Sequence, residues 1–358
     1  MKGFVSAFLA GCMLVGMSFV PTWGDDGPDH QVPEVRPIPL GVSGGNAAGL
    51  PTLSCYTGTL GALVNVGGEL HILSNNHILA RCNWGRIGNP ISQPGKVDTD
   101  CVVSRGEFVA DLSDFEPINL PGENVVDAAL ARIRPGQVRE DGFILDIGVP
   151  NVTPVTAFIG QEVKKSGRTT GLTAGEVSAI NVAVDVERYC PVCGLCLQPH
   201  LVRFVGQIAF TPGTFSAGGD SGSLIVENVA TAPRPVALLF AAGSGVTIGS
   251  PIGPVLEAFG ATMVGMATDQ AVDANATGGT ATDEQALATA LTIQARHQDT
   301  IMQIPGVVGL GIGRSDVTGR LVLRVFLAAE TGEVRQRLPA VLEGMGIETV
   351  ISGPVRAR

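Results

Sequence analysis

Residues around Ser221 have the types and spacing needed for acyl transfer. The serine stands in the run Gly219-Asp220-Ser221-Gly222, which apolar residues follow. A serine hydroxyl attacks a carbonyl only when a base takes its proton and donors stabilise the oxyanion. Flanking glycines allow a sharp backbone turn, which would aim the Gly219 and Ser221 N–H groups at one point. The motif predicts a nucleophile, and a glycine-rich turn between strands is the alternative that it leaves open.

His77 and Asp127 are the candidates for base and orienting acid. Among the five histidines, His77 stands at the end of a predicted strand, whereas His71 lies within one. Asp127 enters an apolar stretch, where a buried carboxylate needs a partner, and an imidazole N–H would supply it. The order His77, Asp127, Ser221 therefore predicts a catalytic triad.

Many short strands must position these residues. Hydrophobic residues make up 45% of the 358 and charged residues 16%, with 48 Gly and 23 Pro, which favours a compact fold of strands joined by tight turns. A helical period at 254–259 predicts a helix that closes the domain. Apolar stretches of strand length, which predict all-β barrels or a sandwich, occur at 58–66, 69–74, 108–112, 128–133, 162–165, 176–185, 201–208, 223–226 and 236–241.

The chain changes character after a small, polar stretch at 266–282, which predicts a linker. Beyond it, 283–358 is predicted to form a small α+β domain. The expected elements are a helix at 283–302, strands at 307–313 and 321–328, a helix at 333–342 that includes Pro339, and a strand at 347–351.

The first 24 residues are predicted to be an export signal, because Lys2 precedes an apolar stretch that ends before two aspartates. A retained membrane anchor and lipidation at Cys12 are the alternatives. Residues 25–49 are rich in Pro, Gly and Asp and are predicted to be an irregular leader.

Removal of the signal would leave six cysteines, an even number that favours disulfides in an exported chain. Cys55 and Cys82 flank His77, so a bridge between them is expected. The chemistry considered above needs no metal or other cofactor. An alternative zinc site, or free thiols, remains open for Cys190, Cys193, Cys196 and His200.

The net charge of −10 and the lack of a basic cluster make nucleic acid an unexpected partner. A protein or peptide substrate is the expected partner. A membrane is expected only if the N-terminal segment is retained or lipidated, and a second copy of the chain, in a homo-oligomer, is a further candidate partner.

Taken together, the three motifs resemble the chymotrypsin-like serine peptidases over roughly residues 50–259. The segment 165–171 is similar to one in the secreted bacterial members of the streptogrisin and alpha-lytic type. The run 58–62, combined with the triad motifs, resembles the plant narrow-leaf peptidase and its bacterial relatives. The resemblance implies an all-β peptidase domain at 50–265, with two β-barrels at about 50–140 and 150–250.

The resemblance also implies the role of each site residue. His77 would be the general base, Asp127 would fix its tautomer and Ser221 would attack the scissile carbonyl. The amides of Gly219 and Ser221 would form the oxyanion hole. Ser223 departs from the pattern, because the commoner residue there is a second glycine.

Two further features follow from the same resemblance. Asp220 needs a cation, and the segment 165–171 implies a buried Arg168–Asp220 ion pair. Small pocket walls without an acid would favour a small or apolar substrate residue before the scissile bond over Lys or Arg. The expected walls are Phe215 on one side and Ala241, Ala242 and Gly243 on the other.

These features predict a serine-type endopeptidase that is secreted or periplasmic, with anchoring to the cell envelope as the other location. The alternative is a catalytically silent or latent binding protein of the same fold, regulated by its C-terminal domain.

Overall fold

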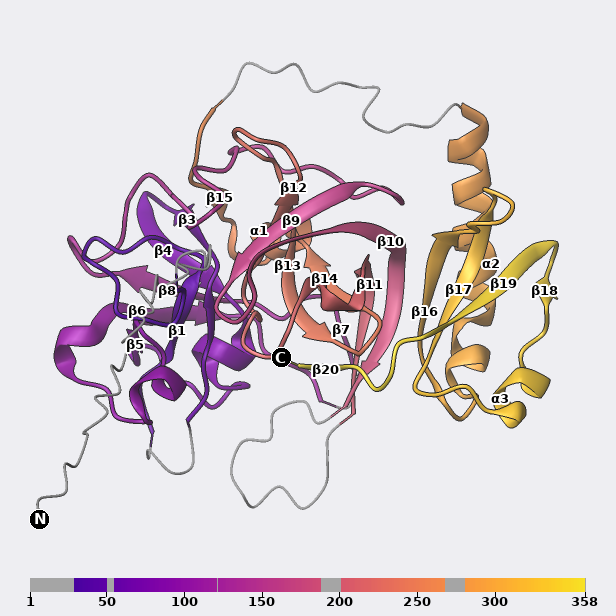
Figure 1. The fold of residues 1–358 in the computed structure, drawn as a ribbon, viewed down its shortest axis with the longest axis horizontal. Coiled ribbons are helices and arrows are strands. Elements are labelled where there is room, and N and C mark those ends of the chain that lie inside the picture. Colours follow the sequence, from indigo (N-terminus) through magenta and orange to yellow (C-terminus); the bar gives the residue numbers. More distant parts are fainter. Residues whose placement is uncertain (1–28, 50–54, 121, 188–200, 268–280, 358) are drawn as a thin grey trace, which may run out of the picture.

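A computed structural model describes residues 29–49, 55–120, 122–187, 201–267 and 281–357. Two twisted sheets lie side by side, and the second continues into a smaller α+β module at the C-terminal end (Figure 1). The predicted export signal, Cys12 and the group Cys190, Cys193, Cys196 and His200 all lie outside the described residues. None of the helices described is both long and apolar enough to cross a membrane.

The first sheet forms the N-terminal barrel, and eight of its strands fall within the described residues, in the order β15-β3-β4-β8-β6-β5-β1-β2. Its pairings are antiparallel, and its interior is a cluster of Ile, Leu, Val and Ala side chains. The strands are β1 Val42–Asn46, β2 Gly58–Leu60, β3 Ala62–Val66, β4 Glu69–Ser74, β5 Pro90–Ser92, β6 Phe108–Phe115, β8 Ala129–Ile133 and β15 Thr262–Met263.

The second barrel contains the longest strands. Every residue of β13 is buried, because its continuous apolar sequence has neighbours on both faces. The strand β10 alternates between exposed and half-buried residues up to Glu176 and is mostly buried from Val177 onward. The strands are β7 Glu123–Asn124, β9 Glu162–Gly167, β10 Gly171–Val186, β11 Val202–Thr211, β12 Leu224–Glu227, β13 Pro235–Ala242 and β14 Thr247–Pro251.

The C-terminal module continues the second sheet. Its strand β16 pairs antiparallel with β10, so the hydrogen-bonded order runs β18-β19-β17-β16-β10 into the barrel. The predicted domain limits at 265 and 283 stay predictions, but the two parts share one sheet. The strands are β16 Val307–Arg314, β17 Leu321–Leu327, β18 Val341–Leu342, β19 Met345–Ile351 and β20 Arg356–Ala357.

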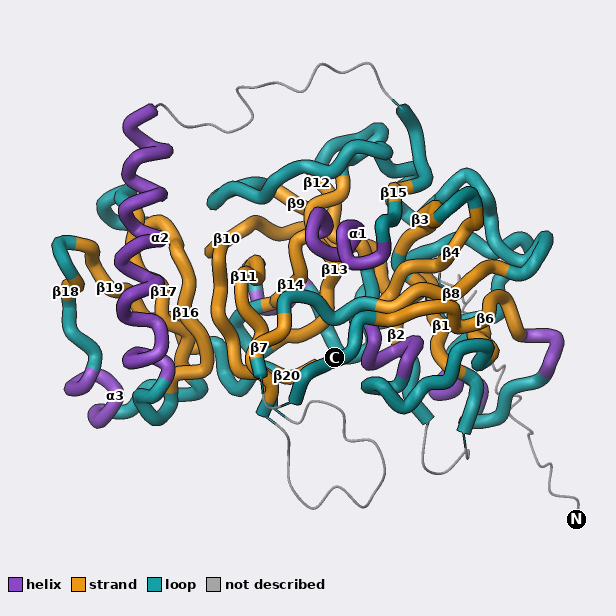
Figure 2. Tube along the Cα trace, turned by 180° about the vertical axis from the view of Figure 1, so that it is seen from behind, coloured by secondary structure: helices purple, strands orange, loops and turns teal. Residues whose placement is uncertain are grey.

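Three α-helices are described: α1 Ile252–Phe259, α2 Ala281–Met302 and α3 Gly332–Arg337. The closing helix predicted at 254–259 is α1, which packs on β13 and β14, and α2 lies against β16 and β17 (Figure 2). The helix predicted at 333–342 is wrong beyond Arg337. Pro339 disfavours a helical conformation at Leu338, and the chain continues into β18.

Two strand boundaries also differ from expectation. The segment 25–49, predicted to be irregular, contains β1, which pairs with β2 and β5 despite its glycines. The strand predicted over 58–66 is broken at Gly61, where an added Cβ would overlap the Gly222 carbonyl oxygen. Elsewhere each predicted strand has a described counterpart, but β5, β7, β14, β15, β18 and β20 were not predicted. The fold is the predicted chymotrypsin-like double β-barrel with a small α+β module.

Candidate active site

His77 and Asp127 are in direct contact. His77 lies in η1 (Asn76–Ala80), a single π-helical turn that follows β4, and Asp127 lies just before β8. Because β4 and β8 are paired neighbours, these two positions meet at the same end of the barrel. Asp127 Oδ2 is 2.5 Å from His77 Nδ1, and Asp127 Oδ1 accepts the His77 backbone N–H at 3.2 Å. Asp127 is fully buried, so this carboxylate holds the imidazole by its Nδ1 side.

Two asparagines that precede His77 hold the turn in place. Asn75 Nδ2 donates to the Asp127 carbonyl oxygen at 2.8 Å, and Asn76 Nδ2 donates to the Glu116 carbonyl oxygen at 2.6 Å. Both asparagines are fully buried. The position of the imidazole is therefore set by side-chain amides as well as by the strands.

Ser221 lies in the turn that precedes β12 and is fully buried. Its Oγ donates to the Phe240 carbonyl oxygen at 3.1 Å, and its carbonyl oxygen accepts the Thr59 N–H at 2.8 Å. A Cβ added to Gly58 would lie 2.6 Å from Ile78 Cδ1 and 2.8 Å from the Ser221 carbonyl oxygen. The nucleophile candidate and the residue after His77 therefore lie against the same glycine.

The glycines around Ser221 are required by backbone conformation. Gly219 has φ of +101° and Gly222 has φ of +95°, a region that L side chains rarely adopt. A Cβ at Gly222 would overlap Ser74 Oγ, and one at Gly219 would lie 2.6 Å from an Arg168 guanidinium nitrogen. Ser74 is the last residue of β4, the strand that leads to His77, so the Ser221 turn packs against the element that positions His77.

Asp220 is held by many donors. It accepts hydrogen bonds from the backbone N–H groups of Thr169 at 2.8 Å, Thr170 at 3.1 Å and Ala217 at 2.8 Å, and from Thr170 Oγ1 at 2.7 Å. Its cation partner is Lys165, whose Nζ lies 3.5 Å from Asp220 Oδ2. This carboxylate ties the nucleophile turn to the β9–β10 turn.

The predicted Arg168–Asp220 ion pair is wrong. Arg168 pairs with Asp98 instead, through Nε at 2.8 Å and through a second guanidinium nitrogen. Asp98 also accepts from Ser43 Oγ at 2.5 Å. Because Asp98 belongs to the first barrel and Arg168 to the second, this pair joins the barrels and leaves Asp220 to another cation.

Lys165 is the site residue that sequence reasoning missed. Burial lowers the pKa of its ammonium below 10.5, and the nearby Asp220 carboxylate opposes that shift. Its Nζ also donates to the Gly171 carbonyl oxygen at 2.9 Å and to Thr170 Oγ1. A signal was present: in a strand with Val163 facing inward, Lys165 faces inward too, because side chains alternate.

The predicted pocket walls are covered. Phe215 is buried and stacks on Phe210, with ring centroids 5.8 Å apart. Ala241 and Ala242 are fully buried, and both pair with β20. A Cβ at Gly243 would overlap the Ser352 carbonyl oxygen. The second of the two expected walls is thus filled by the chain's own residues.

The predicted Cys55–Cys82 bridge is also wrong, because Cys55 is bonded to Cys101. Cys101 follows η2 (Lys96–Thr99), and the Val97 N–H in that turn donates to Thr57 Oγ1 at 2.9 Å. This contact brings the two cysteines together. The positions of Cys55 and Cys82 on either side of His77 in the sequence did not indicate which cysteine lies close to Cys55 in space.

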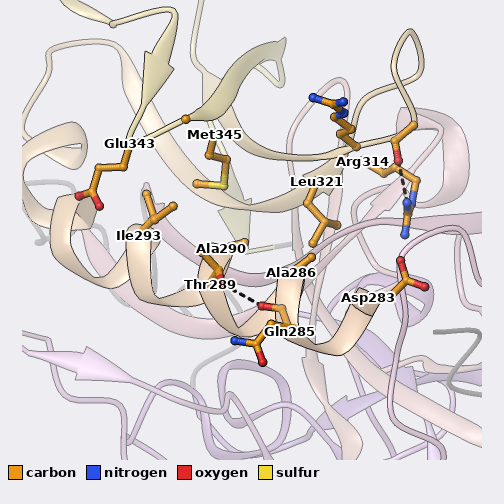
Figure 3. Close-up of a pocket in the computed structure, with 13 residues that line it drawn as sticks. Asp283, Gln285, Ala286, Thr289, Ala290, Ile293, Arg314, Leu321, Glu343 and Met345 are labelled. Atoms are coloured by element: carbon orange, nitrogen blue, oxygen red, sulfur yellow. Dashed lines mark hydrogen bonds between the residues drawn. The ribbon is translucent and has the colours of Figure 1, made fainter. Parts of the chain in front are cut away.

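A cavity of about 850 Å³ lies in the C-terminal module, between α2 and the ends of the neighbouring strands (Figure 3). Apolar side chains such as Ile293, Leu321 and Met345 line it, and no triad residue does. Within the ranges described, no cluster of three or more His, Cys, Asp or Glu side chains is arranged to hold a metal ion.

The double barrel and the His77–Asp127 contact define the class as the chymotrypsin-like serine peptidase fold. Residues 130–249 match the family model described as the Nal1 C-terminal domain, which confirms the resemblance to relatives of the narrow-leaf peptidase. No curated protein matches the sequence.

Solved structures of bacterial serine proteases are similar to the chain. A glutamic-acid-specific serine protease is 21% identical, covering 63% of this chain and 100% of its own, with a TM-score of 0.44. Thermobifida fusca protease A is 20% identical, covering 64% and 99%, with a TM-score of 0.43. Nocardiopsis protease is 16% identical, covering 63% and 98%, with a TM-score of 0.42. Because these scores are below 0.5, a functional assignment has to rest on the site itself.

Proposed function

We propose that the protein is a serine endopeptidase that hydrolyses peptide bonds through an acyl-enzyme on Ser221. The observation that carries the proposal is the buried Asp127 carboxylate, 2.5 Å from His77 Nδ1. A buried carboxylate at this nitrogen favours the tautomer that leaves Nε2 as the proton acceptor, and it stabilises the imidazolium that forms.

In the proposed mechanism, His77 Nε2 takes the proton from Ser221 Oγ as Oγ attacks the scissile carbonyl. His77 then gives that proton to the leaving amine. In the second half of the reaction, His77 takes a proton from a water molecule as the water attacks the ester carbonyl, and it returns this proton to Ser221 Oγ as the ester bond breaks. The Gly219 and Ser221 N–H groups would stabilise the oxyanion, and the φ of +101° at Gly219 supports this role. Asp220 would keep the turn in shape through its donors.

For the substrate, we propose a protein or peptide with a small or apolar residue before the scissile bond. Once the segment that now covers them has moved, Ala241, Ala242 and Gly243 would line the space for that residue, and none of them bears a charge that would select Lys or Arg. A peptide library with varied residues at this position tests the preference, and dominant cleavage after Lys or Arg would contradict it.

We propose an exported location, secreted or periplasmic. Its supports are the N-terminal signal pattern in the sequence and the Cys55–Cys101 disulfide, since such bonds persist mainly in oxidising compartments. Fractionation of cells that express the full chain tests this, with mature protein that begins after residue 24 as the expected result.

The second candidate function is a latent or silent binding protein of the same fold. Two observations favour it: Ser221 Oγ donates to the Phe240 carbonyl oxygen, and β20 covers Ala241 and Ala242. A fluorophosphonate probe separates the candidates. An active enzyme reacts at Ser221, and the Ser221→Ala variant does not. Failure of all forms of the chain to react, despite native circular dichroism, would favour the binding protein.

A further inference from the structure

The strand β20 adds to the edge of β13 beside the nucleophile turn. Ala357 pairs with Ala241 and Arg356 pairs with Ala242, in antiparallel register. The carbonyl oxygen that Ser221 Oγ contacts belongs to Phe240, the residue just before Ala241. Ala357, the second residue of β20, therefore lies one strand position, about 3.3 Å, from that contact, and Arg356 lies two positions away.

β20 lies on the same edge of β13 as β12 does. At Ala241 and Ala242, β14 pairs with the opposite edge of β13, and it also pairs with the earlier residues of β13. β12 pairs with β13 only as far as Leu238, and the Ser221 turn then contacts β13 through hydrogen bonds between Gly222, Ser223 and Leu239. The edge thus carries β12, the nucleophile turn and β20 in succession.

The segment 352–357 is held firmly at this place. Val355 is fully buried in the core of the second barrel with Phe204 and Phe240, and its carbonyl oxygen accepts the Glu187 N–H at 2.8 Å. The Ser352 carbonyl oxygen accepts the Gly245 N–H at 3.2 Å. Figure 1 shows this end of the chain between the two barrels.

We propose that the β13 edge at 241–243 is a binding site for an extended peptide and that segment 352–357 is its resident ligand, so that the protein is latent until this segment leaves. The latency in this inference rests on the proposed function, because a β13 edge that is already paired with β20 excludes a substrate strand. The recognition is β-strand addition: main-chain hydrogen bonds supply affinity, and the small Ala241, Ala242 and Gly243 allow close approach. Residues with the chemistry of Val355-Arg356-Ala357 are the ligand class.

The first test measures binding without catalysis. The full chain carrying Ser221→Ala is compared with the same chain carrying Ala357→Pro as well. Proline removes a backbone N–H and fixes φ, so β20 is weakened, whereas Ala357→Ser keeps the N–H and is the matched control. A fluorescent peptide, Ser-Gly-Pro-Val-Arg-Ala amide, is titrated into each. We expect about fivefold or more tighter binding to the proline variant. Equal binding to all three proteins would overturn the inference.

The second test uses a reversible lock. Paired residues of neighbouring strands have Cα atoms about 4.5–5.5 Å apart, which suits a disulfide, so Ala241→Cys with Ala357→Cys should fix β20 in place. We expect the oxidised form to react with a fluorophosphonate at least fivefold more slowly than the reduced form, with the native chain under the same reductant as control.

The outcomes separate the two proposals. If the peptide binds the proline variant but no form of the chain reacts with the fluorophosphonate, the peptide site stands and the endopeptidase fails. If the native, locked and proline forms all react at one rate, β20 does not shield Ser221 and the inference fails while the endopeptidase stands.

Discussion

Lys165 Nζ lies 3.5 Å from Asp220 Oδ2, and neither side chain is exposed. This pair lies next to the nucleophile candidate, because Asp220 directly precedes Ser221 in sequence. The lysine replaces the arginine that the motif 165–171 implied, and it comes from β9 instead of from the turn that follows. The shape of the Ser221 turn therefore depends on a buried ion pair between that turn and β9.

The Lys165→Met variant should be strongly destabilised. It leaves the Asp220 carboxylate buried without its cation, which costs about 3–5 kcal/mol of unfolding free energy. Urea unfolding checks the size of the loss. The matched control is Lys164→Met, because Lys164 is only half-buried and reaches the Val229 carbonyl oxygen at the surface. Similar losses in both variants would contradict the assigned role of Lys165.

The contribution of Lys165 to the unfolding free energy should become more favourable as the pH rises toward 10.5. Burial lowers the pKa of this ammonium, so the folded protein releases the proton at a lower pH than the unfolded chain does. Between the two pKa values the unfolded state binds more protons, and the unfolding free energy therefore rises with pH. Urea unfolding at several alkaline pH values checks this as a growing difference between native chain and Lys165→Met. A shrinking difference would mean that the pKa is raised.

Arg168 and Asp98 should be energetically coupled to each other and not to Asp220. A double-mutant cycle with Arg168→Ala and Asp98→Ala should give a coupling of about 1–3 kcal/mol, because the pair is largely buried. The parallel cycle with Arg168→Ala and Asp220→Asn serves as the control, and its coupling should be smaller. A larger coupling energy for Arg168 with Asp220 than with Asp98 would instead support the Arg168–Asp220 pair that the motif implied.

The Asp127→Asn variant should lose most peptide hydrolysis while keeping its fold. An amide at this place no longer enforces the tautomer with Nε2 free, and a fall of about 10³–10⁴ in kcat is expected. Hydrolysis of a chromogenic peptide gives the rate, and circular dichroism verifies the fold. A variant that kept full activity would remove Asp127 from the mechanism.

Gly222→Ala should be more damaging than Gly67→Ala. Both glycines have positive φ, so both changes carry the backbone strain of about 1 kcal/mol. Only Gly222 has the Ser74 hydroxyl and the Thr59 carbonyl in the way of an added Cβ, whereas Gly67 has open space. Thermal unfolding of the two variants gives the comparison, and equal melting temperatures would show that the turn can move.

Much of the fold follows from local patterns. Many of the strands and α1 were predictable, because apolar stretches of strand length and a helical period are properties of neighbouring residues. The pairing of β1 was not, since its sequence Val-Ser-Gly-Gly-Asn favours a loop and only its neighbours β2 and β5 make it a strand. The early end of α3 could have been foreseen from Pro339.

The site divides in the same way. His77, Asp127 and Ser221 could be chosen because each stands in a short motif with its own chemical requirement. The resemblance assigned Arg168 to Asp220, although the alternation of side chains along the strand from Val163 already indicated that Lys165 faces inward. The cover that β20 places on Ala241 also escaped prediction, since it joins residues more than a hundred positions apart.

The shared sheet has a practical consequence for dissecting the molecule. If the chain were cut before α2, β10 would lose β16 and present unpaired N–H and C=O groups along a long, apolar strand. Such an edge invites pairing with other chains, so a shortened protein is expected to self-associate. Point changes in β20 therefore offer a cleaner way to expose the β13 edge than removal of the whole C-terminal module.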